Sequence, residues 1–306
     1  MSKKRVRYWV EEMRVPFLTA SVVPVVLGSV MGWYHTGVLY WGYFFLALLG
    51  GVCLHIGTNV CNDYFDHRNR SDEVNVEFVR PFSGGSRMIQ RGRMTPKAVL
   101  TEGLIFFGLG ILIGLYLAWT RGGMVLVLGL IGVFSGYFYT APPFELARRG
   151  IGELIVGINF GTLMVLGAYY VQTGSLSWEA AVLSVPIALL IALVLWINEF
   201  PDYAADKAVG KNTLVVRLGR RTAARGYIVV LMIVYLWIVG AVVLGVTPAW
   251  ALSVLLSFPI AIKAIGVVRR YYENIPNLIS ANAGTILIHL LVGVFLSVSY
   301  VLDRVL

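Results

Sequence analysis

Residues 178–199 read WEAAVLSVPIALLIALVLWINE, and the chain continues as FPDYAAD to residue 206. Between Glu179 and Glu199 no side chain is charged. A helix of roughly 20 such residues crosses a hydrocarbon core about 30 Å thick. Inside lipid a backbone must satisfy its own hydrogen bonds, which favours a helix over an irregular segment. Residues 178–199 therefore predict a transmembrane helix that ends beside a cluster of acids.

Eight further apolar segments of similar length lie along the 306 residues. The chain is 58% apolar and only 13% charged, whereas a soluble domain carries about 25% charged residues. Alternating strands of about ten residues, typical of membrane barrels, do not occur. We predict an all-α, polytopic membrane protein with nine transmembrane helices, formed by residues 1–306 as a single domain. The predicted segments are 16–33, 39–61, 97–119, 123–140, 150–173, 178–199, 224–245, 247–265 and 280–302.

Basic residues lie almost entirely on one side of the predicted membrane. With nine spans the chain ends lie on opposite sides, and only Arg121 and Arg304 of the 25 Lys and Arg residues fall opposite the amino terminus. Because positive loops stay in the cytoplasm, we expect the amino terminus and the long loops to be cytoplasmic, in the cell membrane. The net charge of +9 is then explained by topology and by contact with anionic lipids, and nucleic acid is a poor partner.

Two acidic clusters follow the second and sixth segments, at residues 59–72 and 198–211. Each contains an Asn four residues before an Asp, Asn62 with Asp66 and Asn198 with Asp202, so on a helix each pair shares a face. The clusters are 136 residues apart, an offset of four segments. The repeated Asn-x-x-x-Asp pattern suggests that the chain consists of two related four-helix halves plus one helix. This is a hypothesis of internal duplication.

Carboxylates that converge on one point repel each other unless a cation lies between them. Hard oxygen ligands suit Mg²⁺, whose coordination is often completed by phosphate oxygens of a substrate. The alternative is that each acid pairs with a neighbouring Arg in its loop. The predicted metal ligands are Asn62, Asp63, Asp66, Asp72, Asn198, Asp202 and Asp206.

The loop between the clusters is rich in glycine and arginine. Residues 80–93 read RPFSGGSRMIQRGR. Glycines let a backbone approach an anion, and guanidinium groups bind phosphate oxygens. A solvated basic loop is the alternative. Downstream, Tyr137 and Tyr139 could face a carbocation or belong to an interfacial aromatic belt, and His55 is interpreted as a hydrogen-bonded packing residue.

Together these residues resemble the UbiA superfamily of intramembrane prenyltransferases. The resemblance rests on NDYFD at residues 62–66, on Asp72, and on Asn198, Asp202 and Asp206 leading into GKNTLVVRLG at residues 210–219. It implies a helical bundle with a central cavity capped by cytoplasmic loops. It also implies that an isoprenyl diphosphate is bound through Mg²⁺, and that an aromatic or other lipophilic acceptor is alkylated.

Site roles follow from this resemblance by position. One departure is that Asp72 lies six residues after Asp66, whereas many members have an acid four residues after, where Arg70 stands here. The catalytic residues implied are Asn62, Asp66, Asp72, Asn198, Asp202 and Asp206, and those implied for diphosphate binding are Asn59, Arg87, Tyr139, Arg148 and Lys211.

The longer spacing, the Gly-Gly-Ser loop and the GKNTLVVRLG run are similar to the MenA-type branch. That branch prenylates 1,4-dihydroxy-2-naphthoate in menaquinone biosynthesis. Relatives with hydroxybenzoate, homogentisate, haem, chlorophyllide or geranylgeranylglyceryl phosphate as acceptor share the same metal machinery, so these acceptors are the alternatives.

A secondary transporter is the competing class, because acids inside repeated bundles are expected there too. Against it, the acids lie at one membrane face and not at the midplane. A purely structural scaffold gives no reason for the acidic clusters. Release of pyrophosphate would favour the enzyme, and uptake driven by a proton gradient would favour the transporter.

Overall fold

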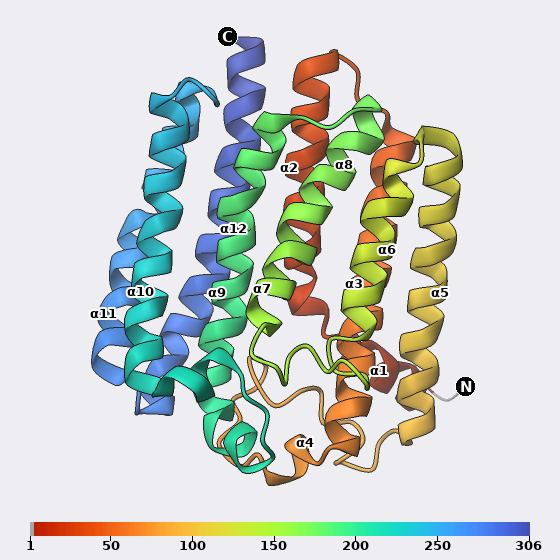
Figure 1. Ribbon diagram of the computed structural model, residues 1–306, viewed down its shortest axis with the longest axis vertical. Helices are drawn as coiled ribbons and strands as arrows, with labels where there is room; N and C mark the ends of the chain where they lie inside the picture. Colours follow the sequence, from red (N-terminus) through yellow and green to blue (C-terminus); the bar gives the residue numbers. More distant parts are fainter. Residues whose placement is uncertain (1–2) are drawn as a thin grey trace.

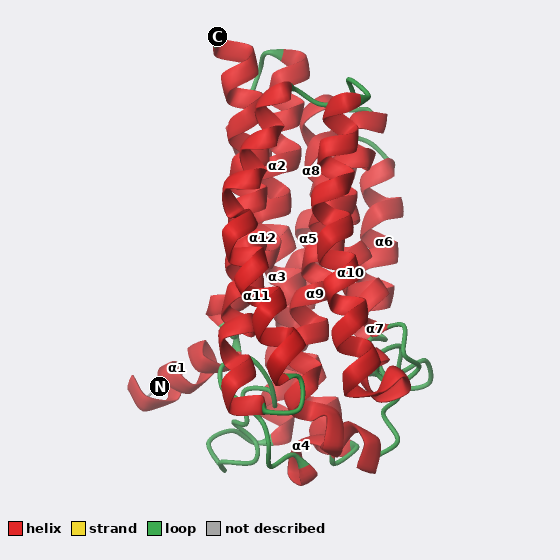
Figure 2. Cartoon of the chain, turned by 90° about the vertical axis from the view of Figure 1, so that its left-hand side faces the viewer, coloured by secondary structure: helices red, strands yellow, loops and turns green. Residues whose placement is uncertain are grey.

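The computed structural model describes residues 3–306, so the first two residues of the predicted domain lie outside it. Long helices run side by side along one axis (Figure 1). Long loops and the short helices α1 (Lys3–Glu12) and α4 (Ser71–Val74) gather at one end, here called the loop end, while the connections at the other end are short (Figure 2). Among the described residues there is no strand, which confirms the predicted all-α class.

Eight helical segments are long and apolar enough to cross a membrane, which makes this a multi-pass membrane protein. The fourth predicted segment, 123–140, is not among the eight and forms α6 (Met124–Tyr137), an apolar helix of 14 residues that packs against α5. The eight are η1 (Val15–Leu18) with α2 (Thr19–Thr36), α3 (Trp41–Arg68), α5 (Pro96–Arg121), α7 (Gly152–Gly157) with η2 (Ile158–Leu163) and α8 (Met164–Thr173), α9 (Trp178–Ala208), α10 (Leu214–Val243), η3 (Ala249–Ser257) with α11 (Phe258–Tyr271), and α12 (Ile275–Val305).

Helices α3 and α9 continue past the apolar segments that predict them. They end at Arg68 and Ala208, so both acidic clusters begin on helix and not in loop. Pro201 lies inside α9 and has no N–H for the carbonyl of Ile197 one turn earlier. Asn282 of α12 satisfies that carbonyl instead, since its Nδ2 donates to Ile197 O at 3.1 Å. The helix continues past the proline to Ala208 and so includes Asp206.

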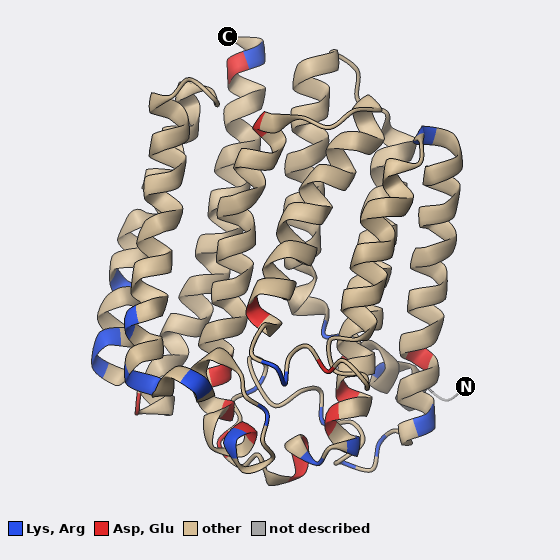
Figure 3. Ribbon diagram, viewed as in Figure 1, with Lys and Arg blue, Asp and Glu red and all other residues tan. Residues whose placement is uncertain are grey.

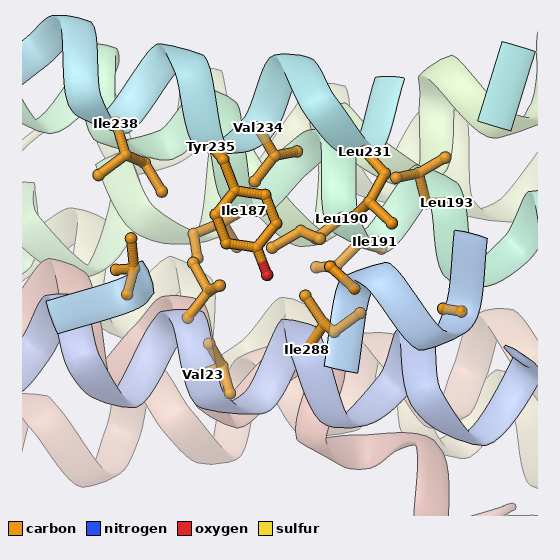
Figure 4. Packing of buried hydrophobic residues seen from close by; sticks show 14 of the residues in the cluster. Val23, Ile187, Leu190, Ile191, Leu193, Leu231, Val234, Tyr235, Ile238 and Ile288 are labelled. Atoms are coloured by element: carbon orange, nitrogen blue, oxygen red, sulfur yellow. The ribbon is translucent and has the colours of Figure 1, made fainter. Parts of the chain in front are cut away.

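The buried core lies where α9 packs against α10 and α12. Ile187, Leu190 and Ile191 of α9 face Leu231 and Ile238 of α10 (Figure 4). Lipid tails are as apolar as these side chains, so close van der Waals packing holds such helices together. The core fixes α9, which carries the second acidic cluster.

Charged side chains gather at the loop end of the bundle (Figure 3). This distribution agrees with the sequence, in which all but two basic residues fall on one side of the predicted membrane. The chemistry of polar ligands is therefore expected at the loop end.

Candidate active site

The two acidic clusters, far apart in sequence, face one cavity at the loop end. Its volume is about 180 Å³. Asp66 of α3 and Asp72 of α4 line it from one side, and Asp202 and Asp206 of α9 from the other. Asn62 and Asn198, each four residues before its Asp, line it too, as expected for side chains on one helix face.

Nine of the twelve predicted site residues line this cavity. The three that do not are Asp63, Arg87 and Arg148. The nine are Asn59, Asn62, Asp66, Asp72, Tyr139, Asn198, Asp202, Asp206 and Lys211.

Lys211 joins the two clusters. Its Nζ lies 3.4 Å from Asp66 Oδ2 and 3.8 Å from Asp206 Oδ1. Burial disfavours the charged ammonium, but the carboxylates of Asp206 and Asp66 outweigh it and raise the pKa of Lys211 well above its usual value. The lysine is therefore a fixed positive charge within the cavity.

Asp72 is held by the loop that follows the first cluster. Gln90 Nε2 donates to Asp72 Oδ2 at 3.0 Å. Burial, followed by the negative charge of Asp66, raises the pKa of Asp72 to about 7. A cation in this cavity would relieve the repulsion between the two acids.

Asp63 turns away from the cavity because its oxygens are used within the protein. Its Oδ1 accepts from Arg14 Nη2, and its Oδ2 accepts from the backbone N–H of Ser86 at 2.9 Å. Ser86 Oγ in turn donates to the buried Glu12 of α1. This network ties α1 and the glycine loop, residues 80–93, to α3. The predicted role of Asp63 as a metal ligand stays a prediction.

The side chains of Arg87 and Arg148 contact backbone carbonyls and an aromatic ring in the loops around the cavity. Arg87 lies over the ring of Phe78, 4.1 Å from its centroid, and donates to Asn75 O at 3.4 Å. Arg148 donates to the carbonyls of Val209 at 3.1 Å and Gly210 at 3.2 Å. Their predicted contact with a diphosphate stays a prediction, and in this geometry both position the loops around the cavity.

The glycine loop needs its glycines. Gly84 and Gly85 have φ of 73° and 67°, a left-handed conformation that side chains rarely adopt. A Cβ on Gly84 would lie 2.5 Å from Phe78 Cβ, and one on Gly85 would lie 2.7 Å from Asp63 Oδ1. Both glycines line the cavity, so the backbone itself forms part of the wall.

The donor set of the cavity fits a hard divalent cation. Five acids line it (Asp66, Asp72, Glu199, Asp202, Asp206), against two cations, Arg14 and Lys211. Within residues 3–306 no three acidic, His or Cys side chains lie close enough together to hold a metal as they stand. The four aspartates and the two asparagines that line the cavity carry oxygen donors of the kind Mg²⁺ prefers.

An apolar cavity of about 270 Å³ adjoins the polar one. Thr58 and Phe160 line both, so they mark the junction. Phe160 belongs to η2, a π-helical segment, and such segments are frequent at functional sites. The apolar cavity lies among α2, α3, α5, α6 and α8 and is walled mainly by Leu, Ile, Val and Gly.

Arg14 and Asn75 are among the cavity-lining residues that lie outside the predicted set. Arg14 follows α1 and was counted only as a topology signal. Asn75 comes after α4, outside both Asn-x-x-x-Asp patterns, and its Nδ2 donates to Asp202 Oδ1 at 2.6 Å. Neither position carries a spacing signal, because each reaches the site through tertiary packing.

Comparison with known proteins gives consistent matches. Residues 21–279 match the UbiA prenyltransferase family. The chain is 31% identical over 289 residues to 1,4-dihydroxy-2-naphthoate octaprenyltransferase of Bacillus subtilis, covering 94% of this chain and 89% of that protein. It is 29% identical over 298 residues to 2-carboxy-1,4-naphthoquinone phytyltransferase of a Synechocystis species, covering 96% and 93%. The structure of a UbiA homolog from Archaeoglobus fulgidus bound to GPP and Mg²⁺ shares the fold, with a TM-score of 0.66 at 15% identity, covering 97% of this chain and 99% of that one.

Proposed function

Because the chain belongs to the UbiA prenyltransferase family, we propose that it catalyses the Mg²⁺-dependent transfer of a polyprenyl group from an isoprenyl diphosphate to an aromatic acceptor. The observation that carries this proposal is the junction of the two cavities. Carboxylates and Lys211 surround one cavity, and apolar side chains surround the other. A diphosphate with a long hydrocarbon chain has the same two-part chemistry.

The proposed acceptor is 1,4-dihydroxy-2-naphthoate, whose prenylation leads to menaquinone. Two observations support this choice. The Bacillus subtilis and Synechocystis relatives both act, by name, on carboxylated naphthalene derivatives, and they match most of this chain. Asp72 also lies six residues after Asp66, as the resemblance to the MenA-type branch leads us to expect.

The diphosphate would lie between the two acidic clusters. Lys211, charged and buried, would donate to an oxygen of the leaving diphosphate, and Arg14 also lines the cavity. Bound Mg²⁺ would neutralise charge that develops on the leaving group. The residues that would hold it are Asp66, Asp72, Asp202 and Asp206, with Asn62 and Asn198 to orient them.

The reaction generates positive charge on the first carbon of the prenyl group. Water would capture this carbon, so the apolar walls beyond Phe160 protect it by exclusion. The ring of Tyr139 lies on the cavity wall, where its face could attract that charge. Burial, followed by the charge of Glu199, raises the pKa of Tyr139, which keeps the phenol neutral.

The proposed location is the cell membrane, with the loop end in the cytoplasm. The support is that 23 of 25 basic residues fall on the side of the loop end, which the positive-inside rule associates with the cytoplasm. Both substrates are lipophilic at one end and would enter from the bilayer.

Purified protein in lipid nanodiscs tests the proposal directly. We would supply Mg²⁺, a labelled polyprenyl diphosphate, and dihydroxynaphthoate, hydroxybenzoate or homogentisate as separate acceptors. Mass spectrometry should find a prenylated naphthalene product and an equal amount of pyrophosphate. Prenylation of a different acceptor would contradict the assigned acceptor, and absence of pyrophosphate with every acceptor would contradict the proposed reaction.

A further inference from the structure

We propose that His55 is the base that accepts the hydroxyl proton of the aromatic acceptor, and that Ser21 orients it. This inference rests on the proposed function and extends it to a residue outside both acidic clusters. His55 lies on α3 and lines the polar cavity. The sequence alone favoured a packing role for it.

His55 continues the stripe of α3 that faces the cavity. The stripe contains His55, Asn59, Asn62 and Asp66, at spacings of four, three and four residues, which share one helix face. His55 lies seven residues before Asn62, or about 10 Å along the helix axis. It is therefore removed from the carboxylates, at the inner end of the polar cavity.

Contacts hold the ring in one orientation. Ser21 Oγ of α2 lies 2.7 Å from His55 Nδ1, and both residues are buried. The ring also packs on Phe160, with 4.4 Å between centroids. Phe160 marks the junction with the apolar cavity, so His55 lies where the reactive end of a prenyl chain and an aromatic ring would meet.

His55 Nε2 is the ring nitrogen that remains available to accept a proton. Among the described residues, the contact with Ser21 is the only hydrogen bond of the His55 ring. The proposal takes the tautomer in which Nδ1–H donates to Ser21 Oγ, so that Nε2 keeps its lone pair and can act as a base. Of the residues that line the cavity, the four aspartates are assigned to the cation and Lys211 is charged. Glu199 directly follows Asn198 at the acidic end of the cavity, which leaves His55 as the neutral base at the inner end.

The proposed steps balance as follows. The acceptor hydroxyl gives its proton to His55 Nε2, and the oxygen lone pair increases electron density on the ring. A ring carbon then forms a bond with the first carbon of the prenyl group, whose C–O bond breaks as pyrophosphate leaves with the electron pair. The ring regains aromaticity when its C–H proton passes to pyrophosphate, and the imidazolium returns its proton to the ring oxygen.

The test compares His55→Gln with His289→Gln. His289 is the matched control because it is also buried in a membrane-spanning helix but does not line the cavity. With dihydroxynaphthoate as acceptor, His55→Gln should lower kcat by about 100-fold or more, the usual contribution of a general base. Its KM for the polyprenyl diphosphate should stay within threefold of wild type, and His289→Gln should keep wild-type kcat.

A second readout separates a base from a structural residue. A ring-fluorinated acceptor has a more acidic hydroxyl and needs the base less, so His55→Gln should lose clearly less kcat with it than with the parent acceptor. Ser21→Ala should lower kcat without changing KM for the diphosphate. An equal loss with both acceptors, or a loss of diphosphate binding that matches the loss of kcat, would overturn the proposal.

The two proposals fail in different ways. If wild-type protein prenylates dihydroxynaphthoate and His55→Gln retains its kcat, only the role of His55 is wrong. If wild-type protein prenylates no hydroxylated aromatic acceptor, the proposed function is wrong and the role of His55 is wrong with it.

Discussion

Asn75 and Asp202 are joined by a hydrogen bond of 2.6 Å from Asn75 Nδ2 to Asp202 Oδ1, although 127 residues separate them. The bond fastens the loop after the first acidic cluster to the helix that carries the second. The other amide atom, Asn75 Oδ1, is buried without a hydrogen-bond partner among the described residues. An unpaired buried acceptor costs about 1–3 kcal/mol, so Asn75 is expected to serve the site and not only the fold.

Asn75→Ala should weaken binding of Mg²⁺ and of the polyprenyl diphosphate by about 10- to 100-fold, the usual effect of removing a residue that orients a metal ligand. The reason is that Asp202 would lose the donor that fixes its carboxylate. Titration of activity against Mg²⁺ measures the change. Asn277→Ala, at an exposed position of α12, is the matched control. Unchanged Mg²⁺ dependence in Asn75→Ala would show that the contact only closes the loop.

Asp66→Ala and Asp202→Ala should each abolish prenyl transfer while the protein still inserts into the membrane. Each substitution removes one carboxylate, and the two carboxylates lie on opposite sides of the same cavity. EDTA should stop the wild-type reaction, and added Mg²⁺ should restore it. Pyrophosphate release, measured beside Glu273→Ala as an exposed control, checks the result. Turnover retained by either aspartate variant, or indifference to EDTA, would remove the argument for a metal between the clusters.

Lys211→Met should destabilise the protein most when no divalent cation is present. Its ammonium lies between Asp66 and Asp206, and loss of a buried partner leaves carboxylates unpaired at a cost of about 3–5 kcal/mol. Mg²⁺ should recover part of this stability because it can replace the missing positive charge, whereas prenyl transfer should stay at least about 100-fold lower.

The midpoint of thermal inactivation, measured with Mg²⁺ and with EDTA, tests this coupling. Lys207→Met is the control, since Lys207 is exposed in the last turn of α9. A midpoint for Lys211→Met that does not depend on Mg²⁺ would mean that the lysine and the cation do not share a site.

Residue spacing was enough to predict that the site forms from two distant clusters. Asn62 with Asp66, and Asn198 with Asp202, share a face on any helix, so their convergence followed once α3 and α9 were expected to end on one side. Spacing could not show that α9 survives Pro201. The carbonyl that Pro201 leaves without a helical donor is satisfied by Asn282, which comes from α12.

Charge alone could not show which charged side chains line the cavity. Asp63 lies beside Asn62 in sequence, but Arg14 and the N–H of Ser86 occupy its oxygens. Arg87 and Arg148 have the chemistry that binds phosphate, but their guanidinium groups contact loop carbonyls. These partners come from other parts of the chain, and such tertiary contacts leave no local pattern in the sequence.

Gly161→Ala should prevent correct packing of η2 against α9. A Cβ at this position would lie 2.3 Å from Ala188 Cα and 2.5 Å from Ala188 N, which are backbone atoms that cannot rotate away. Overpacking of this kind costs about 1–3 kcal/mol or more. Gly108→Ala is the control, because no atom lies within 4 Å of its Cβ and alanine favours a helix by up to about 1 kcal/mol. Equal yields of folded protein for the two variants would contradict the close approach.

Gly167→Phe should shorten the prenyl chain that the protein accepts. Gly167 lines the apolar cavity, and its Cβ would have only Leu128 Cδ1 near it, at 3.9 Å, so a phenyl ring can enter without a backbone clash. The ring would take up space proposed for the distal part of the chain, and kcat/KM should fall by about tenfold or more for a long polyprenyl diphosphate. Geranyl diphosphate leaves that space empty, so its turnover should change little.

Competition between the long and the short diphosphate in one reaction, read by product mass, gives the selectivity directly. Gly266→Phe on α11 adds the same ring at an exposed position that does not line the cavity, and should keep wild-type selectivity. If Gly167→Phe slowed both diphosphates equally, the ring would have disturbed the junction near Phe160. If it slowed neither, the prenyl chain would not occupy the apolar cavity that lies among α2, α3, α5, α6 and α8. The proposal that this cavity binds the hydrocarbon part of the substrate would then be wrong.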